Sequence, residues 1–430
     1  MYWQADKEKI DKIFSDFYSE TVDTSFEPSF LQNRQIICLH DSGQEAGWQS
    51  TWEWATWEQW QERLKGVEKL YPDCAQELRR SIKKTLPDGW EANIPAFPAD
   101  RKGISTKDAS DMVLRAVAPP PSDSIGSLSG ISPSMKTSPK ECNQGQGCSI
   151  PYEGTFLVFS DYMRPSIRVA ALMGLNVVYV LTHDGVRRGE EGADFQSIGE
   201  LTLAALREIP NLTVIRPCDA NETAAAWRFV LGGSVGPVAL VLNQQAVPAL
   251  EPTTSEAADG LHRGAYIMKE PKNETPEAVL IASGPEAHVA LEAARMLDGK
   301  RIVRRGKAAV RVVSMPSWEL FEKQSNAYRL SVLGPQADIR LVIEGGCSQG
   351  WDGFFGAKGD VVTVDRFGPY VPYRVLQERS GLTPEKVVER VLDLLKQCAL
   401  KQREGYSLQR LSLPTREHNM YGRDNFGPGR

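Results

Sequence analysis

The sequence predicts an α/β protein, with a doubly wound parallel sheet followed by a second α/β domain. From about position 151 to about position 400, short apolar runs of strand length alternate with segments whose apolar residues recur at helical spacing. Capping residues mark several of the helix starts, among them Asp219 and Thr383. An alternation of strands and helices is typical of parallel sheets covered by helices.

One β-α-β unit is especially clear. An extended apolar run, Thr155–Phe159, leads through Ser160–Asp161, which we expect to cap the following helix. A buried strand, Val177–Leu181, then ends in a polar loop that contains Thr182–Asp184 and the acidic run Gly189–Gly192. Because ligands bind at the carboxyl ends of strands in parallel sheets, this loop is the expected position of a functional site.

The alternation continues along the chain. In the first domain we expect a helix at 198–209, a strand at 212–217, a helix after the N-cap Asp219 and a buried strand at 238–242. In the second we expect strands at 277–283, 309–315, 339–344 and 360–364, and helices at 286–297 and 318–332. The closing helix follows its cap Thr383 and carries an apolar stripe to Cys398.

The composition indicates a globular protein with two or three cores. The chain has 430 residues, of which 41% are hydrophobic, and a formal net charge of −5. Without a cluster of Lys and Arg, that charge argues against nucleic-acid binding. The seven cysteines form no C-x-x-C pair, so no zinc site is expected, and Cys142 and Cys148 fit free thiols better than a bridge. A charged start and the lack of a membrane-length apolar run predict a cytoplasmic protein without a membrane partner.

Residues 1–118 are expected to form a divergent N-terminal segment and a helical linker. His40–Ser42 contains the residue types of a hydrolase triad, but consecutive residues cannot form one. Five tryptophans between positions 48 and 60 precede a helical pattern, so packing explains them better than a sugar-stacking platform. A capped helix from Thr106 ends at Pro119–Pro121, and the Ser-, Gly- and Pro-rich residues 119–150 are expected to be a flexible loop.

Two phrases after this loop carry a family resemblance: FSDYMRPSIRVAALMG from position 159 and THDGVRRGEEG from position 182. They closely resemble the pyrimidine-binding domain of transketolase. The phrases LPDGW, FPADRKG, VRVVSMPSWELFE, KGDVV and DRFG are also similar to that family, so the resemblance covers 86–118 and about 152–397. It implies a pyrimidine-binding domain at 151–255, the carboxyl-terminal domain of the family at 264–400, and a tail at 401–430.

The resemblance implies thiamine diphosphate as a cofactor. Phe156 and Phe159 match the aromatic pair that packs on its aminopyrimidine ring, and Tyr162 follows them. Aromatic rings suit a flat heterocycle, although core packing at a strand end is an equally good explanation. His183 matches a histidine near the substrate, and Glu191 stands in the place of an aspartate that contacts a sugar hydroxyl.

The sequence also departs from the family. It lacks the Gly-Asp-Gly motif of the diphosphate and metal cradle, and it lacks the glutamate that activates the cofactor, so no metal site is expected. Phe195 replaces a histidine that assists proton transfer, and Gln244 replaces an arginine that pairs with substrate phosphate. Since one positioned acid or base contributes on the order of 10²- to 10⁴-fold, we expect little transketolase turnover from this chain alone.

Arg187 and Arg188 lie in the polar loop, where substrate phosphate would approach. Two arginines suit bidentate binding of an anion and could provide the phosphate pairing that Gln244 does not. Surface neutralisation by Glu190 and Glu191 is the commoner explanation for such a pair. The sequence thus offers Arg187, Arg188 and Gln244 as candidates for binding a sugar phosphate.

Two functions are compatible with these matches and departures. One is thiamine diphosphate-dependent transfer of a two-carbon ketol between sugar phosphates, impaired or dependent on a partner. Such a protein would be a homo- or hetero-oligomer with a diphosphate-binding-domain protein that supplies the diphosphate and magnesium site. The other is a non-catalytic transketolase relative that serves as an interaction or regulatory subunit. A gene model that omits an exon at 119–150 would also explain the missing glutamate.

Overall fold

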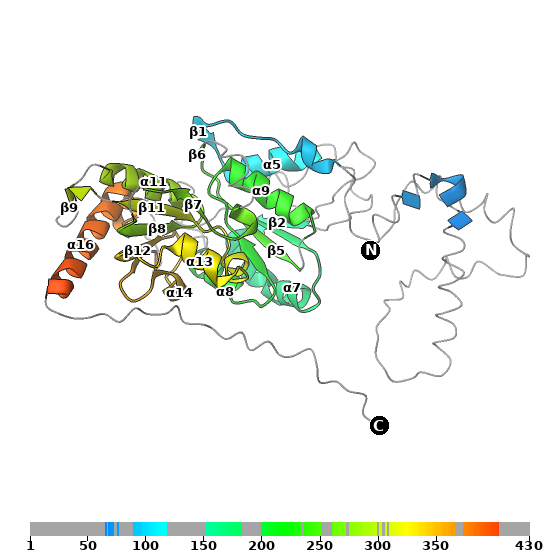
Figure 1. Ribbon diagram of the computed structural model, residues 1–430. Helices are drawn as coiled ribbons and strands as arrows, with labels where there is room; N and C mark the ends of the chain where they lie inside the picture. The colour runs from blue at the N-terminus through cyan, green and yellow to red at the C-terminus, as the bar shows by residue number, and fades with distance from the viewer. Residues whose placement is uncertain are drawn as a thin grey trace, which may run out of the picture.

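The protein contains two α/β units built around separate sheets. The structure is a computed structural model that describes residues 65–66, 68–72, 75–76, 89–117, 152–182, 199–233, 236–250, 260–271, 275–298, 301–302, 306–307, 309–365 and 373–403. In Figure 1 the first unit carries the labels α7 and β2, and the second carries the labels α11 and α16. The predicted fold class, a doubly wound parallel sheet followed by a second α/β domain, is confirmed.

The sheet of the first unit is wholly parallel. Its strands lie in the order β2 (Tyr152–Phe156), β3 (Val178–Thr182), β5 (Val238–Leu242) and β4 (Thr213–Ile215). The register aligns Phe156 with Thr182, and Thr182 with Leu242. The carboxyl ends of these three strands therefore form one edge, which is where ligands bind in open α/β sheets.

Helices cover both faces of this sheet. They are α5 (Thr106–Val117), α7 (Ser160–Leu172), α8 (Gly199–Arg207) and α9 (Ala220–Leu231). Val178 and Val180 of β3 pack in one core with α5 and α9, whereas Tyr179 and Leu181 pack in another core with α7 and α8. Successive side chains of a strand point to opposite faces, so each central strand supplies both cores.

The sheet of the second unit has one antiparallel edge strand. Its order is β13 (Asp360–Val362), β12 (Ile339–Ile343), β8 (Ala278–Ala282), β11 (Val310–Ser314) and β7 (Tyr266–Lys269). All neighbours pair in parallel except β7, which is antiparallel to β11. The carboxyl ends of β12, β8 and β11 again lie side by side.

Two groups of helices cover this second sheet. They are α11 (Glu286–Leu297) and α16 (Pro384–Arg403) on one face, and α12 (Trp318–Glu322), α13 (Asn326–Leu333) and α14 (Asp352–Phe355) on the other. Thr383 caps α16 through a hydrogen bond from the amide of Lys386, as the sequence predicts. The helix α15 (Tyr373–Ser380) precedes α16.

Short elements complete the described chain. These are the helical turns η1 (Trp90–Asn93) and η2 (Leu157–Phe159), and the strands β1 (Asp100–Ile104), β6 (Val247–Ala249), β9 (Arg301–Ile302) and β10 (Gly306–Lys307). The strand β1 pairs antiparallel with β6. Within β1, Gly103 has a positive φ of 68°, and an added Cβ would lie 2.0 Å from the carbonyl oxygen of Val247. Only glycine permits this close approach.

Three local predictions are wrong. The strand expected over Thr155–Phe159 ends at Phe156, because the chain turns into η2. Ser160 does not cap α7: the helix begins at Ser160 itself, and its N-cap Phe159 makes no side-chain hydrogen bond. The helix expected over 318–332 is broken into α12 and α13, since the hydroxyl of Ser325 accepts a hydrogen bond from the amide of Tyr328 and starts a new helix.

Other predictions concern residues outside the described ranges. They are the segment 1–50 with His40–Ser42, the five tryptophans, the loop 119–150 with Cys142 and Cys148, and the tail beyond 403. These interpretations and the predicted domain limits stay predictions. Among the described helices, none combines the length and the apolar composition that a membrane span requires.

Candidate functional site

Three aromatic side chains gather at the carboxyl end of β2. Phe156 ends the strand, Phe159 ends η2, and Tyr162 lies in the first turn of α7. The rings of Phe156 and Phe159 stack, with centroids 5.6 Å apart and planes inclined by 30°. The ring of Tyr162 lies 6.2 Å from that of Phe159 and is 82% exposed. We call these three residues the aromatic cluster; it gives the sheet edge a partly open apolar surface.

Among the described residues, two buried polar groups on the same edge of the sheet have no hydrogen-bond partner. One is the hydroxyl of Ser160, which follows η2, and the other is the amide nitrogen Nδ2 of Asn243, which follows β5. Both residues are 1% exposed. A buried polar group without a partner typically costs about 1 to 3 kcal/mol, so unpaired groups of this kind often mark a functional position.

Asn243 also fixes the start of α5 at this edge. Its Oδ1 accepts a hydrogen bond from the backbone amide of Thr106 at 3.2 Å, and its own backbone amide donates to the hydroxyl of Thr106 at 2.8 Å. The amide of Lys107 donates to the carbonyl oxygen of Asn243 at 3.2 Å. The positive end of the α5 dipole therefore lies beside the end of β5, and the first turn of α5 includes the buried residue Lys107.

The structure describes four of the predicted site residues. Phe156, Phe159 and Tyr162 come together in the aromatic cluster, whereas Gln244 is exposed at the end of β5. The roles assigned to these four residues stay predictions. The remaining four predicted residues lie outside the described ranges: His183, Arg187, Arg188 and Glu191.

Lys107 was not among the residues predicted from the sequence. Its position directly after Ser105 and Thr106, which open a predicted helix, was the available signal. The sequence does not reveal which strand end this helix start would meet, because Thr106 and Asn243 are 137 positions apart. Lysine side chains are seldom buried, and Lys107 is only 8% exposed.

The edge fits one part of the cofactor that the resemblance implies. An aminopyrimidine ring needs an apolar face and polar groups near its rim, and the aromatic cluster, Ser160 and Asn243 offer both kinds of group. Within the described ranges, no group of three or more His, Cys, Asp or Glu side chains could hold a metal ion. The described residues therefore fit the ring of the cofactor.

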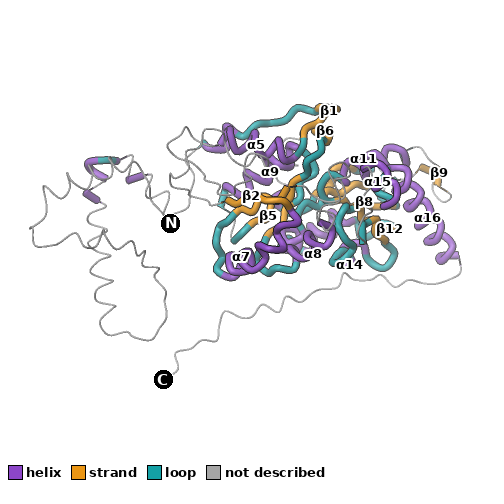
Figure 2. Tube along the Cα trace, turned by 180° about the vertical axis from the view of Figure 1, so that it is seen from behind, coloured by secondary structure: helices purple, strands orange, loops and turns teal. Residues whose placement is uncertain are grey.

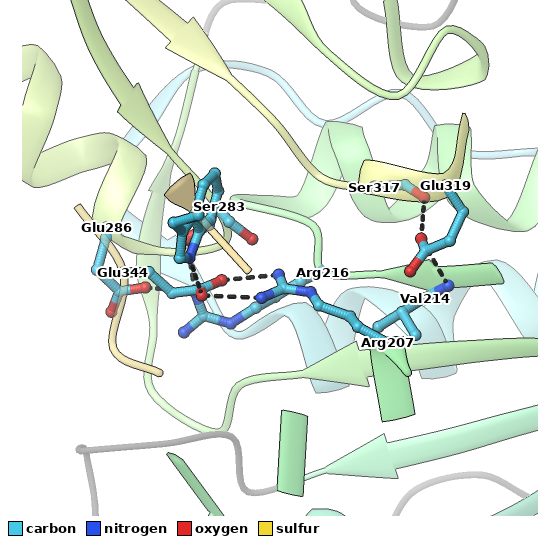
Figure 3. A network of polar contacts seen from close by, with 9 residues as sticks. Arg207, Val214, Arg216, Ser283, Glu286, Ser317, Glu319 and Glu344 are labelled. Carbon is cyan, nitrogen blue, oxygen red and sulfur yellow. Dashed lines mark hydrogen bonds and ion pairs between the residues drawn. The ribbon is translucent and has the colours of Figure 1, made fainter. Parts of the chain in front are cut away.

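The corresponding edge of the second sheet is filled by two arginines of the first unit. Arg207, the last residue of α8, donates two hydrogen bonds to the carboxylate of Glu344, at 2.9 and 2.8 Å. Its guanidinium lies 3.9 Å from the ring centroid of Trp318. Arg216, just after β4, donates to the carbonyl oxygen of Ser283 at 2.6 Å (Figure 3). We call this set of contacts the arginine interface.

Both arginines share the carboxylate of Glu344. Arg216 lies 2.6 Å from the carboxylate of Glu286 and 3.8 Å from that of Glu344, and all three side chains are at most 6% exposed. The indole of Trp351 also donates to Glu344, at 2.7 Å. Burial by itself would raise the pKa of Glu344, but the charge and hydrogen bonds of Arg207, helped by Arg216 and Trp351, hold it below its usual value. Glu344 therefore stays ionised.

A neighbouring contact closes the edge strand β4. The amide of Val214 donates to the carboxylate of Glu319, which also accepts from the hydroxyl of Ser317 (Figure 3). The amide of Arg216 donates to the carbonyl oxygen of Pro316 at 2.9 Å. Desolvation raises the pKa of Glu319, although the charge of Arg207 opposes the change. Residues of the second unit thus accept hydrogen bonds from backbone amides along the edge strand of the first sheet.

A second polar cluster joins the two units. Glu222 of α9 accepts hydrogen bonds from the hydroxyls of Tyr266 and Ser314 in the second unit, at 2.7 and 2.5 Å. Asp219 caps α9 by accepting from the amide of Glu222, and it also accepts from the amide of Leu250. Burial, with the neighbouring charge of Glu222, raises the pKa of Asp219 to about 6.

Two family models match the chain. Residues 144–249 match the model described as "Transketolase, pyrimidine binding domain", and residues 264–383 match "Transketolase-like TK C-terminal domain". Among curated relatives, a transketolase of Geobacillus stearothermophilus is 41% identical over 368 residues, and one of Bacillus subtilis is 35% identical over 415 residues. These alignments cover 78% and 89% of this chain but only 53% and 59% of the relatives.

Solved structures of transketolases are also similar to this chain. A transketolase of Pichia stipitis in complex with sedoheptulose 7-phosphate has a TM-score of 0.69 at 26% identity, over 80% of this chain and 53% of that one. A transketolase of Leishmania mexicana has a TM-score of 0.67 at 30% identity, over 80% and 52%. A chain described as a split gene transketolase, inactive beta4 tetramer, shares the fold with a TM-score of 0.52 at 24% identity, over 68% of this chain and 99% of its own length.

Proposed function

The chain belongs to the transketolase family, and from this premise we propose that it acts in thiamine diphosphate-dependent transfer of a two-carbon ketol between sugar phosphates. Its part is to bind the pyrimidine end of the cofactor. The observation that carries this proposal is the aromatic cluster beside the unpaired Ser160 hydroxyl and Asn243 amide nitrogen. The chain spans about half the length of the first relative it matches, and in this proposal a diphosphate-binding domain completes the activity.

Each side chain of the edge has a distinct part in this proposal. Phe156 and Phe159 hold the ring by stacking, and Ser160 lies where a hydroxyl can bond to its polar rim. When bound, the cofactor supplies the carbon nucleophile that ketol transfer requires. The residues of this chain orient that group and exclude water from one of its faces.

Lys107 is our candidate for the substrate anion. It is 8% exposed, it lies in the first turn of α5, and its amide is bonded to Asn243 at the end of β5. A helix start and an ammonium group both favour a phosphate. Gln244, Arg187 and Arg188 remain the substrate-binding candidates taken from the sequence.

The second component in this proposal is a diphosphate-binding-domain protein that brings the diphosphate and magnesium site. In this division, the present chain holds only the pyrimidine end of the cofactor. The chain described as a split gene transketolase has a comparable fold and is described as inactive in its own tetramer, which fits the same division.

Reconstitution tests the proposal. The full chain is mixed with a chain that carries the amino-terminal diphosphate domain of the Geobacillus stearothermophilus relative, and binding of thiamine diphosphate with magnesium is measured by calorimetry. We expect binding and ketol transfer by the mixture and neither by this chain alone. Failure of the mixture to bind the cofactor, or ketol transfer by this chain alone, contradicts the proposal.

A single substitution then locates the ring. Phe159→Ala removes the central ring of the aromatic cluster and is expected to weaken cofactor binding by about 1 to 3 kcal/mol, by analogy with bases stacked on aromatic side chains. Phe229→Ala is the matched control, because Phe229 lies in α9 and its ring contacts His262. Equal affinities of the two variants, with both folded, would assign Phe159 to the core.

A non-catalytic subunit is the second candidate. It is favoured by Gln244, which is exposed at the strand end where the family resemblance calls for a phosphate-pairing arginine. The same reconstitution separates the two functions. Cofactor binding by the mixture without transfer of a ketol from any sugar phosphate supports the non-catalytic subunit.

A further inference from the structure

The helix α8 connects the arginine interface with the aromatic cluster. Figures 1 and 2 show α8 between α7 of the first unit and α14 of the second unit. At its carboxyl end, Arg207 contacts the second unit. Farther back in the helix, Leu203 and Leu206 share a buried core with Leu157 of η2. Since η2 ends at Phe159, one helix joins the second unit to the segment that carries the central ring of the cluster.

Arg207 fixes the end of α8 both in position and in orientation. Its two hydrogen bonds to Glu344 form a planar fork, and its guanidinium lies 3.9 Å from the ring centroid of Trp318 and 5.6 Å from a ring centroid of Trp351. The side chain of Arg207 is 5% exposed and that of Glu344 is 0% exposed, so solvent screens this ion pair little. Glu344 directly follows β12, and its amide donates to the carbonyl oxygen of Val362 in β13. The anchor of α8 therefore belongs to the second sheet.

Leu203 lies between this anchor and η2. It precedes Arg207 by four positions, so the two side chains lie on the same side of α8. In the second unit, Gly346 approaches it so closely that an added Cβ would lie 3.3 Å from Cδ2 of Leu203. In the first unit, Leu203 and Leu157 belong to one core, in which α8 packs on η2, and both are at most 1% exposed. A displacement of α8 would therefore change the packing beneath η2.

The turn η2 has little stability of its own. It consists of three residues, and such short turns depend on contacts with other elements. The residues before η2 and before α7 are Phe156 and Phe159, whose side chains have no acceptor for a capping hydrogen bond. The ring centroids of these two phenylalanines lie 5.6 Å apart. Their stacked arrangement thus depends on the packing of η2 against its neighbours, and α8 is one of these.

We propose that Arg207 is a positioning residue: by fixing α8 to Glu344, it holds η2 and the aromatic cluster in the arrangement that receives the cofactor ring. This inference rests on the proposed function, because that function gives the aromatic cluster its ligand. Apolar packing between α8 and η2 is non-directional and permits a helix to slide, whereas the fork of Arg207 sets a single position. The second unit thus acts on ligand binding at the edge of the first sheet through α8.

Hydrogen exchange of the full chain tests this positioning role without cofactor or partner. Arg207→Met removes both hydrogen bonds to Glu344 and keeps an unbranched apolar side chain at the end of α8. The amide of Ser160 reports on η2, because it donates to the carbonyl oxygen of Leu157. In the variant this amide should exchange about 10-fold faster relative to the amides of β3 in the same unit. A loss of stability alone accelerates exchange in β3 at least as much, so the ratio of the two rates separates positioning from stability.

Glu286→Gln is the matched control. The carboxylate of Glu286 lies 2.6 Å from Arg216, which follows β4 and does not belong to α8, so this change weakens the same interface at a different element. The exchange ratio of Ser160 to β3 should stay that of the wild type. Arg207→Lys keeps the charge but cannot form the fork, and it provides the same measurement if Arg207→Met does not fold. Its ratio should lie between those of the wild type and Arg207→Met.

Cofactor binding gives the second measurement. In the reconstituted mixture, Arg207→Met should raise the dissociation constant of thiamine diphosphate about 10-fold, and Glu286→Gln should leave it unchanged. An unchanged exchange ratio at Arg207, or equal changes in the two variants, overturns the positioning role. A changed ratio with unchanged cofactor affinity overturns it as well. A changed ratio in a chain whose mixture binds no thiamine diphosphate supports the coupling of α8 to η2 and contradicts the proposed function.

Discussion

The carboxyl edges of the two sheets occupy the same topological position but have opposite contents. At the first edge, Phe156 and Phe159 form part of an open apolar surface and Asn243 keeps a donor without a partner. At the second edge, Arg216 and Glu344 lie at most 1% exposed and engage each other and their neighbours. Ligands generally bind at such edges, but here only the edge of the first sheet is open to a ligand. The edge of the second sheet is covered by the contacts that join the two units.

The two edges differ in their charged groups and in how those charges are compensated. In the arginine interface, each guanidinium meets a carboxylate or a carbonyl oxygen of the other unit, so the buried charges are compensated within the protein. At the first edge, the hydroxyl of Ser160 and the amide nitrogen Nδ2 of Asn243 are unpaired beside a helix start. The second edge also contains unpaired groups, the hydroxyl of Ser283 and the indole nitrogen of Trp318. Compensated buried charges therefore distinguish the edge that joins the units, whereas an open apolar surface beside unpaired donors is suited to an external ligand.

The largest effect is expected at the closed edge. Glu344→Gln removes the carboxylate that Arg207 and Arg216 share and leaves buried guanidinium charge without this partner. The free energy of unfolding should fall by about 3 to 5 kcal/mol in a urea titration. Glu208→Gln is the matched control, because Glu208 accepts an exposed hydrogen bond from Gln349. Equal decreases in the two variants would mean that the arginine interface does not hold the units together.

A smaller effect is expected from pH at the second polar cluster. The pKa of Asp219 is about 6 in the folded protein and 3.8 ordinarily, so the folded state takes up the proton first. Its contribution to stability therefore grows as the pH falls through 6 and is complete below about pH 4. At about 1.36 kcal/mol per pKa unit, the wild type should gain up to about 3 kcal/mol over Asp219→Asn between pH 7.5 and pH 4. Parallel stability curves for the two proteins would contradict this.

The smallest effect is expected for binding of a sugar phosphate at the open edge of the first sheet. Fructose 6-phosphate should raise the melting temperature of the full chain, and Lys107→Met should remove this protection, since a charge-assisted phosphate contact contributes about 1.5 to 3 kcal/mol. Lys102→Met, at an exposed position of β1, is the control, and fructose is the uncharged ligand. If Lys107→Met keeps the protection and a double change of Arg187 and Arg188 to Ala abolishes it, the anion binds at the polar loop instead.

The sequence could predict those structural features that depend on residues close together in the chain. Asp219 caps α9 and Thr383 caps α16 as expected, because a cap depends on three or four consecutive positions. The same kind of signal was overlooked at Ser325, where a capping serine divides a continuous helical pattern. The prediction that Ser160 caps α7 was wrong, because η2 comes directly before α7 and Ser160 is already part of the helix rather than the residue before it.

The site was predictable only in part, for a related reason. The aromatic cluster lies within seven consecutive positions, so its members were found together from Phe156 to Tyr162. The contact of Thr106 with Asn243 and that of Arg207 with Glu344 each join residues 137 positions apart. No local sequence pattern predicts such pairs of residues, because their contact depends on how the sheets and helices pack.

The arginine interface also limits how the chain can be recombined. Its basic members, Arg207 and Arg216, belong to the first unit, and its acidic members, Glu286 and Glu344, belong to the second. Gly345 also leaves little space at this interface, because an added Cβ would lie 3.0 Å from the carboxylate of Glu286, which would have to shift. A chimera that exchanges one unit for that of a relative without the matching charges would carry two orphaned cations or two orphaned anions. A recombination breakpoint between the two units is therefore expected to be tolerated only where both parents keep this set of charges.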